Sequence, residues 1–328
     1  MLTYRRAAPD DTGQILDLIR ASLGPGSVPR TRAYWEWKHV DNPFGPSPVL
    51  VAEADGHIVG LRAFMRWTWI ANGESVRAVQ AVDTATHPDW QRRGIFSRLT
   101  RDLLADVRED GVAFVFNTPN KNSLPGYLKM GWQTVGRVPL WVRPVRAAVL
   151  GRGRETLDGR YPGAARLLDD PALAAFLARL PAAPGRYRTP RTPDVLRWRY
   201  DGPPGIPYHA VWELSDSGDG AAIAFRARRR GRWRVLYISD VLVGPGRTGR
   251  RTARALLRHL LRTAPVDVAV AMGVAGAPAR SVLARCGFVR PPSAGPTFVV
   301  NPLSPDPSLP PPTAPESWSW TLGDIELF

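Results

Sequence analysis

The feature that most constrains the fold of this chain is an internal repeat. The segment VDTATHPDWQRRGIFSRLTRDLL resembles SDVLVGPGRTGRRTARALLRHLL, and Asp83 pairs with Asp240 at an offset of 157 residues (240 − 83). Further on, YLKMGW resembles LARCGF, and upstream WEWKHVDNPFG resembles LRWRYDGPPG. The three matches occur in the same order in both halves, so we interpret the 328 residues as two copies of one α/β unit.

Local patterns predict the elements of the first copy. Residues 10–22 are typical of a capped amphipathic helix. Residues 48–86 indicate three strands joined at Asp55-Gly56 and Asn72-Gly73, both strong hairpin signals. A helix over 94–109, a strand over 112–117 and a helix around 121–130 are expected to follow, and the second copy repeats this order.

The same patterns set the domain boundaries that we predict. The first domain covers 1–145, a helical connector 146–185, the second copy 186–301, and a spacer with a docking tail 302–328. The stretch NPLSPDPSLPPPTAP (301–315) is too rich in proline for helix or sheet, so we expect an extended spacer there.

Composition excludes several classes of protein. The only cysteine is Cys286, so an intrachain disulfide is impossible and a reducing compartment fits. The five histidines are scattered, so we expect no metal. No apolar run approaches the roughly 18 residues of a membrane span, and the first residues lack the apolar stretch of a signal peptide. We therefore expect a cytoplasmic protein with no membrane partner.

The formal net charge is +15, and arginine supplies 41 of the 44 basic residues (44 − 3 lysines). Such a charge fits a nucleic-acid or polyphosphate partner. It also fits a bias toward GC-rich codons, because alanine, glycine and proline are abundant as well. Since the arginines are spread along the chain instead of forming one arm, we favour the second interpretation and expect no nucleic-acid partner.

A short motif between a strand and a helix predicts an anion site. The strand ends at Thr86, and QRRG then leads into the helix. Free amide groups at a helix N-terminus bind phosphate, and glycine at position 94 lets the phosphate approach the main chain. A tight turn with solvated arginines would produce the same four letters, so the motif is weak alone.

Together with a second motif, this turn resembles the GNAT acetyltransferase superfamily. QRRGIF after one strand and NKNSLPGYLKMGW after the next are similar to the two GNAT motifs, and VDTATHPDWQRRGIFSRL looks like the tandem branch that includes Eis-type enzymes. The resemblance implies two tandem GNAT-fold domains, each a mixed, mostly antiparallel sheet flanked by helices. It implies acetyl coenzyme A as co-substrate.

The resemblance also implies roles for individual residues. The residues implied in coenzyme binding are Thr84, Ala85 and Thr86 at the pantetheine arm, Arg92, Arg93, Gly94, Ile95, Phe96 and Ser97 at the pyrophosphate, and Asn120. Tyr127 would protonate the departing sulfur, with a core tyrosine as the alternative. Asn120 has a helix cap as its alternative. Phe96 departs from the family, which usually has Gly or Ala there, and this departure leaves the length of the acyl chain open.

The second copy departs much further from the family. By the offset, Arg251 replaces Gly94 and Leu283 replaces Tyr127. A large side chain at the phosphate turn obstructs close approach, and leucine cannot donate a proton. We therefore expect the second copy to be degenerate and catalytically inactive.

No base for the acceptor amine is evident on the strands. At the positions where many GNAT relatives carry a glutamate, this sequence has Gln80 and Val115. For Asp83 we favour a structural role, because the second copy retains an aspartate, Asp240, at the matching position. Eis-type relatives use a C-terminal carboxylate, which implies Asp324, Glu326 or the Phe328 carboxylate as the base, with Trp318 and Trp320 anchoring the tail. A frayed acidic end and an ordered-water relay are the alternatives.

Three functions fit these observations. The first is an acetyl-CoA-dependent N-acetyltransferase acting on a small-molecule amine such as an amino sugar or a natural-product intermediate. The second is an aminoacyl-tRNA-dependent transferase with twin GNAT-like domains, which would bring tRNA as partner. The third is a non-catalytic acyl-CoA-binding protein, since fold alone does not imply catalysis. For the acceptor, Trp67 and Trp69 either line a pocket or pack against the second copy.

Overall fold

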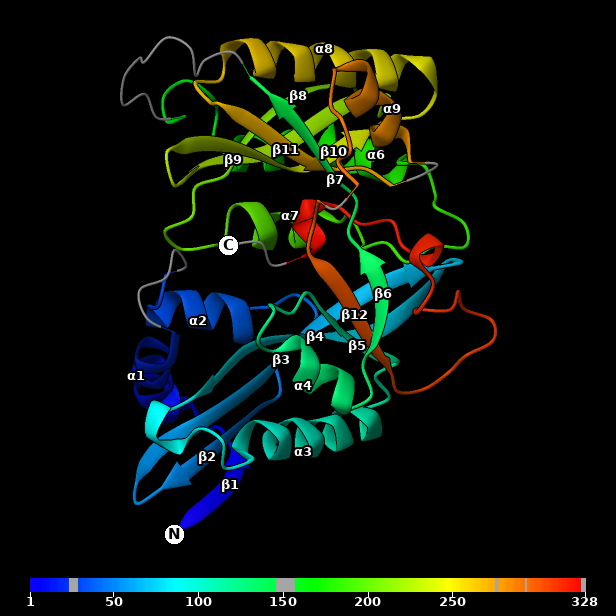
Figure 1. Cartoon of the computed structure of the whole chain (residues 1–328). Helices are drawn as coiled ribbons and strands as arrows, with labels where there is room; N and C mark the ends of the chain where they lie inside the picture. Colours follow the sequence, from blue (N-terminus) through cyan, green and yellow to red (C-terminus); the bar gives the residue numbers. More distant parts are fainter. Residues whose placement is uncertain (24–28, 146–156, 275–276, 293, 326–328) are drawn as a thin grey trace.

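The chain forms two β-sheets that lie one above the other (Figure 1). The computed structural model describes residues 1–23, 29–145, 157–274, 277–292 and 294–325. In these residues α3 and α4 cover the outer face of the first sheet, α8 and α9 cover the outer face of the second, and α2, α7 and the C-terminal segment lie between the sheets. The helices are α1 (Thr12–Leu23), α2 (Arg32–His39), α3 (Ile95–Glu109), α4 (Leu124–Lys129), α5 (Ala164–Leu168), α6 (Leu173–Ala178), α7 (Pro193–Tyr200), α8 (Gly246–Thr263) and α9 (Pro278–Arg285).

The first sheet has seven strands in the order β1-β2-β3-β4-β5-β12-β6. They are β1 (Leu2–Arg6), β2 (Val49–Ala54), β3 (His57–Ala71), β4 (Glu74–Thr86), β5 (Phe114–Asn117), β6 (Gln133–Arg137) and β12 (Thr297–Pro302). Only β4 and β5 run parallel, because α3 connects them across the outer face. Both predicted hairpins are present, and Asp55 and Asn72 adopt the positive φ values, 51° and 52°, that such turns need.

The second sheet has five strands in the order β7-β11-β10-β9-β8. They are β7 (Leu140–Pro144), β8 (His209–Leu214), β9 (Gly220–Arg230), β10 (Trp233–Val243) and β11 (Val268–Met272). Again the one parallel pair, β10 with β11, is connected by a long helix, α8. The prediction of two α/β units with mixed, mostly antiparallel sheets is therefore confirmed.

The two sheets exchange a strand across the domain boundaries that we predict from the sequence. Strand β7, which we placed in the first domain (1–145), pairs with β11 of the second sheet. Strand β12, which we assigned mostly to the second copy, is inserted between β5 and β6 of the first sheet. Strand pairing is a long-range choice that local sequence patterns do not encode.

An approximate two-fold relation links the copies where α2 meets α7. The indole N–H of Trp37 donates to the Trp198 carbonyl (2.8 Å), and the indole N–H of Trp198 donates to the Trp37 carbonyl (2.9 Å). The two rings stack with centroids 5.1 Å apart. Such reciprocal contacts are typical of a symmetric dimer interface, here formed within one chain.

The C-terminal segment packs into the core between the sheets. Trp318 is fully buried, with its ring against Phe114, Phe298 and Trp69, and Trp320 stacks on it. The predicted anchoring of the tail is thus present. From Leu303 to Ala314 the chain forms neither helix nor strand, as its prolines predict, whereas Asn301 and Pro302 belong to β12. None of the described helices has the length and apolar character needed to cross a bilayer.

Candidate active site

The candidate site begins where β4 and β5 separate. Their pairing covers only Ala78–Gln80 against Phe114–Phe116, although β4 continues to Thr86. A β-bulge interrupts β4 opposite Arg62 and Ala63, and the extra residue is Asp83 with φ of 42°. Beyond Gln80, β4 pairs with no strand of the described residues on its β5 side, which leaves main-chain groups of Thr84 and its neighbours available to a ligand.

The N-terminus of α3 lies next to this separation. Its N-cap residue, Gly94, has φ of 79° and provides no side chain to cap the helix, and the first turn contains no acidic residue. The amide groups of Ile95, Phe96 and Ser97 therefore have no side-chain cap. A Cβ at Gly60 of β3 would lie 2.5 Å from Ile95 Cγ2, so this glycine lets the first turn sit close against the sheet. An anion at the predicted site would contact these amide groups.

Arg62 of β3 is the residue that sequence reasoning missed. It is fully buried, and its Nη1 donates to both the Thr84 hydroxyl and the Tyr127 hydroxyl, the latter at 2.8 Å. Its Nε and Nη2 have no hydrogen-bond partner among the described residues. A buried cation without an anion is costly, so these free donors indicate an anionic or strongly polar ligand. The detectable signal was an arginine in the otherwise apolar run IVGLRAF.

Aromatic rings surround the Arg62 guanidinium. Its Cζ lies 4.7 Å from the Phe64 ring centre, 5.2 Å from Tyr127 and 5.7 Å from Phe96. The rings of Phe96 and Tyr127 meet edge to face with centroids 5.7 Å apart, and Phe96 Cε1 lies 3.0 Å from where a Gly126 Cβ would be. Phe96 of α3 therefore packs against α4 near the point where β4 and β5 separate. Phe96, the residue that departs from the pattern of the resemblance, thus packs against Tyr127, and the missing side chain of Gly126 leaves room for its ring.

Asp83 is held by the end of α2 on the opposite face. Its Oδ2 lies 2.8 Å from Lys38 Nζ and accepts a hydrogen bond from His39 Nε2 at 2.8 Å. Burial alone would raise the pKa of the Asp83 carboxyl, but Lys38 and His39 outweigh it, and the pKa is lowered. Burial lowers the pKa of His39 despite Asp83, so His39 is neutral at pH 7. Asp83 is therefore a structural anchor.

The second copy repeats this anchor with different residues. Asp240 follows a bulge in β10 and accepts hydrogen bonds from the Tyr200 hydroxyl and from Arg191 Nη2, the latter at 2.9 Å. Tyr200 stands at the same place in α7 as His39 in α2, since both are the second residue after the reciprocal tryptophan. The shared contact explains why an aspartate is present at this position in both halves.

Asn120 caps the turn before α4. Its Oδ1 accepts from the main-chain N–H groups of Asn122 (2.9 Å) and Ser123 (3.0 Å). This is the cap that we set beside a coenzyme contact as the alternative. The carboxamide oxygen is thereby engaged locally.

Asp324 is engaged in an ion pair and is fully buried. Its Oδ1 lies 3.0 Å from Arg191 Nη2, and its Oδ2 accepts from the Thr321 main-chain N–H at 2.7 Å. Because Arg191 also binds Asp240, Asp324 fastens the tail to the second sheet. With both oxygens occupied, it is poorly suited to accept a proton from a substrate. Glu326 and Phe328, the other predicted bases, lie outside the described residues.

The second copy lacks the phosphate turn altogether. Eight residues separate β4 from α3, whereas only Gly244 and Pro245 separate β10 from α8. Arg251 therefore lies inside α8 and does not occupy the place of Gly94, the N-cap of α3, which corrects this pairing. Leu283, at the position of Tyr127, is fully buried in the second core. Ser319 to Thr321 of the tail line the small cavity where β10 and β11 separate, so the chain itself occupies much of this place.

Tryptophans close the space between the sheets near Gln80. Trp67 donates its indole N–H to the Thr189 hydroxyl (2.9 Å), and Trp69 packs against Trp318. Both are buried, so they pack against the second half of the chain. Gln80, Lys38 and Ile325 line a small cavity beside them. Across the described part of the chain, no group of three His, Cys, Asp or Glu side chains is placed to hold a metal.

Comparison with protein families supports this description of the first half. Residues 3–135 match the family model described as acetyltransferase (GNAT) domain. No curated protein sequence matches the chain.

Solved structures match nearly the whole chain. A GCN5-related N-acetyltransferase from Anabaena variabilis has a TM-score of 0.64 at 12% identity and covers 93% of this chain and 73% of its own. Eis1 from Mycobacterium abscessus has a TM-score of 0.54 at 15% identity, and the match covers 92% of this chain and 74% of Eis1. Saccharomyces cerevisiae N-myristoyltransferase with bound myristoyl-CoA has a TM-score of 0.56 at 11% identity, and the match covers 92% of this chain and 82% of the transferase. At such identities the likeness concerns the fold alone.

Proposed function

We propose that this chain, whose residues 3–135 match the model of a GNAT acetyltransferase domain, is an acyltransferase that moves an acetyl group from acetyl-CoA to the amine of a small molecule. The observation that carries the proposal is Arg62: a fully buried guanidinium with two donors free, next to an uncapped helix N-terminus and the Tyr127 hydroxyl. A phosphate- and thioester-bearing donor supplies the electron-rich oxygens that these groups lack.

The residues present fit such a donor. Main-chain N–H groups of Ile95, Phe96 and Ser97 would hold its pyrophosphate, with Arg92 and Arg93 adding charge from the exposed turn. The unpaired edge of β4 from Thr84 to Thr86 would hold the pantetheine arm. Acyl-CoA supplies an activated thioester, which amines attack readily once they are deprotonated and positioned.

Tyr127 is suited to act as the acid for the departing thiolate. Its hydroxyl oxygen accepts a hydrogen bond from Arg62, so its own proton is available for donation. The side chain is only 4% exposed, which limits competing proton exchange with water. Arg62 holds the hydroxyl in place and offers positive charge where negative charge develops.

The base belongs to the end of the chain in this proposal. Asp83 and Asp324 are both engaged in ion pairs, and Gln80 and Val115 cannot accept a proton. Ile325 lines the small cavity beside Gln80, and Glu326 and the Phe328 carboxylate follow directly in sequence.

Replacement of Glu326 by Gln, or removal of Phe328, would shift the acidic limb of the kcat pH profile. An unchanged pH profile in both variants would leave an ordered-water relay as the acceptor of the proton from the substrate amine.

The test of the function is turnover of acetyl-CoA against a panel of small amines, with amino sugars included. We expect Tyr127→Phe to reduce kcat by about 10² or more, the usual contribution of a positioned acid, with little change in the affinity for coenzyme A. The matched control is Tyr161→Phe, which removes a hydroxyl bonded to Thr263 in the second half and leaves turnover unchanged. Equal turnover in both variants would remove Tyr127 as the acid, and no turnover with any amine would contradict the proposed class of acceptor.

A further inference from the structure

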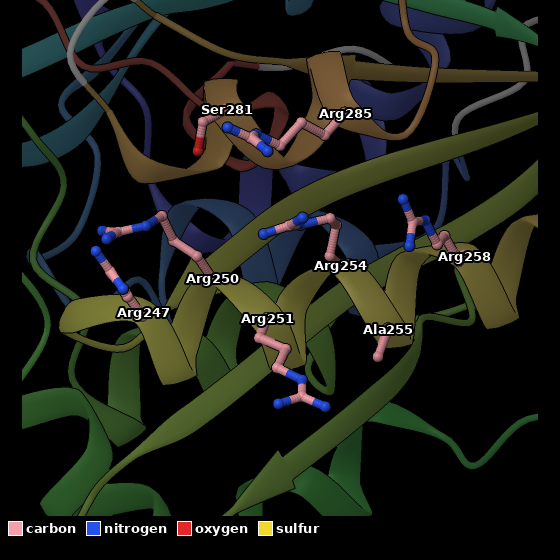
Figure 2. A pocket seen from close by; sticks show the side chains of 8 residues that line it. All are labelled: Arg247, Arg250, Arg251, Arg254, Ala255, Arg258, Ser281 and Arg285. Atoms are coloured by element: carbon pink, nitrogen blue, oxygen red, sulfur yellow. The ribbon is translucent and has the colours of Figure 1, made fainter.

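A pocket lined by arginines lies between α8 and α9, on the outer face of the second sheet. Its volume is about 780 Å³. Arg250, Arg254 and Arg258 rise from α8 on the side that faces α9, where Arg285 lies beside Ser281 (Figure 2). The lining residues are Arg247, Arg250, Arg251, Arg254, Ala255, Arg258, Ser281 and Arg285.

No acidic side chain offsets this charge within the described residues. None of the six lining arginines forms an ion pair with a carboxylate that the structure describes, and α8 itself contains no Asp or Glu from Gly246 to Thr263. The Nε of Arg254 is buried and has no hydrogen-bond partner there. Like charges three and four residues apart weaken a helix by a few tenths of a kcal/mol per pair. The cluster is therefore unfavourable unless an anion is bound to it.

The pocket is separate from the candidate active site. Helices α8 and α3 cover opposite outer faces of the molecule, with both sheets and the tail between them (Figure 1). It also differs in construction, because side chains line it, whereas the site at α3 relies on main-chain amides and one buried arginine.

We propose that this pocket binds a small polyphosphorylated anion, one that carries several adjacent phosphate groups. Guanidinium groups pair with phosphate through two parallel hydrogen bonds, and arginine is the side chain best suited to this geometry. A concave pocket of this volume suits a molecule of nucleotide size, whereas a nucleic-acid duplex requires an extended basic surface. The proposal does not depend on the acetyl-transfer reaction.

The test is calorimetric titration of the full chain with sodium tripolyphosphate in low salt. We expect saturable binding that weakens by about tenfold or more in the double variant Arg250→Gln/Arg254→Gln, because charged hydrogen bonds are lost. Arg262→Gln is the matched control, since Arg262 lies on the same helix outside the pocket and is exposed. The double variant Arg92→Gln/Arg93→Gln removes charge only at the turn before α3, so it is expected to retain the tripolyphosphate binding step that Arg250→Gln/Arg254→Gln weakens.

Several results would overturn this proposal. They are absence of saturable binding, equal weakening in the Arg262 control, and loss of binding only in the Arg92/Arg93 variant, which would place the anion at the active site. Binding of an RNA oligonucleotide without binding of tripolyphosphate would assign the arginines to a nucleic-acid surface instead. Unfolding temperatures measured for each variant separate loss of the pocket from loss of the fold. None of these outcomes bears on whether Tyr127 supports turnover.

Discussion

At the scale of single residues, Arg62 defines the site more sharply than the motif that led to it. The motif predicts a helix N-terminus that can bind phosphate, and α3 provides one. The motif does not predict a buried guanidinium that joins Thr84 of β4 to Tyr127 of α4. That contact combines three elements distant in sequence, and only the fold brings them together.

Replacement of Arg62 by Met distinguishes the contribution of the guanidinium to folding stability from its contribution to ligand binding and turnover. Methionine keeps the apolar volume of the stem and removes a buried charge that lacks an anion, so we expect the free energy of unfolding in urea to stay level or rise by up to about 2 kcal/mol. Coenzyme A affinity and turnover are expected to fall by about tenfold or more, because donors to the ligand are lost.

Arg66→Met is the control, since Arg66 pairs with Asp110 at the surface, away from Tyr127. A large loss of stability in Arg62→Met would show that the guanidinium serves the fold. Unchanged binding and turnover would show that it does not contact the ligand.

Residue-scale predictions from sequence succeeded where chemistry is local. The two hairpin turns, at Asp55-Gly56 and Asn72-Gly73, follow from short motifs. Asn120 and Asp324 are different, because their oxygens are occupied by a turn and by Arg191, respectively. The identity of a hydrogen-bond partner depends on the folded neighbourhood, which the sequence near each residue does not specify.

At the scale of elements, the main difference between the copies is the connection from the parallel strand to its helix. In the first copy, residues 87–94 form a loop that leaves the α3 amides free, whereas in the second copy α8 begins almost directly after β10. A constant offset in the repeat concealed this difference, because it matched residues of the loop before α3 to residues inside α8. The existence of both helices was predictable, and the position at which α8 begins was not.

The bulge of β4 gives a prediction for pH dependence. Asp83 fastens this bulge to α2, and its pKa is lower in the folded chain than the ordinary value of 3.8. Its stabilising contribution is therefore complete above pH 3.8 and is lost as the pH falls below that value toward the folded-state pKa. We expect Asp83→Asn to lower the free energy of unfolding by about 2 kcal/mol at pH 7, modest for a broken ion pair because the side chain is 24% exposed.

The measurement is urea unfolding of both chains between pH 7 and pH 3. The difference between them is expected to hold down to about pH 4 and to shrink below it. Asp110→Asn, at an exposed ion pair with Arg66, is the control and is expected to change stability by less than about 1 kcal/mol. A difference that grows on acidification would contradict the assignment of Asp83 as an anionic anchor.

At the scale of the whole molecule, the two copies are interlocked by strand exchange. Strand β12 lies between β5 and β6 of the first sheet, and β7 completes an edge of the second. The paired tryptophans Trp37 and Trp198 and the buried Trp318 close the space between the sheets. The second copy therefore contributes a strand to the sheet of the first copy.

A shortened chain tests this dependence. Residues 1–145 alone would leave β5 and β6 without the strand between them and would expose the faces buried by Phe298 and Trp318. We expect this fragment to be aggregated or unfolded by circular dichroism and size-exclusion chromatography. A folded, monomeric fragment that binds coenzyme A would show that the copies are independent domains.

The central claim is that the first copy, through α3 and Arg62, holds the acyl donor. Calorimetric titration of the full chain with acetyl-CoA tests it most directly. We predict saturable binding that is weakened by about tenfold or more in Arg92→Gln/Arg93→Gln and in Arg62→Met, with its tightest step unchanged in Arg250→Gln/Arg254→Gln. No uptake by the unmodified chain, or loss of uptake only when the arginines of α8 are replaced, would contradict the account.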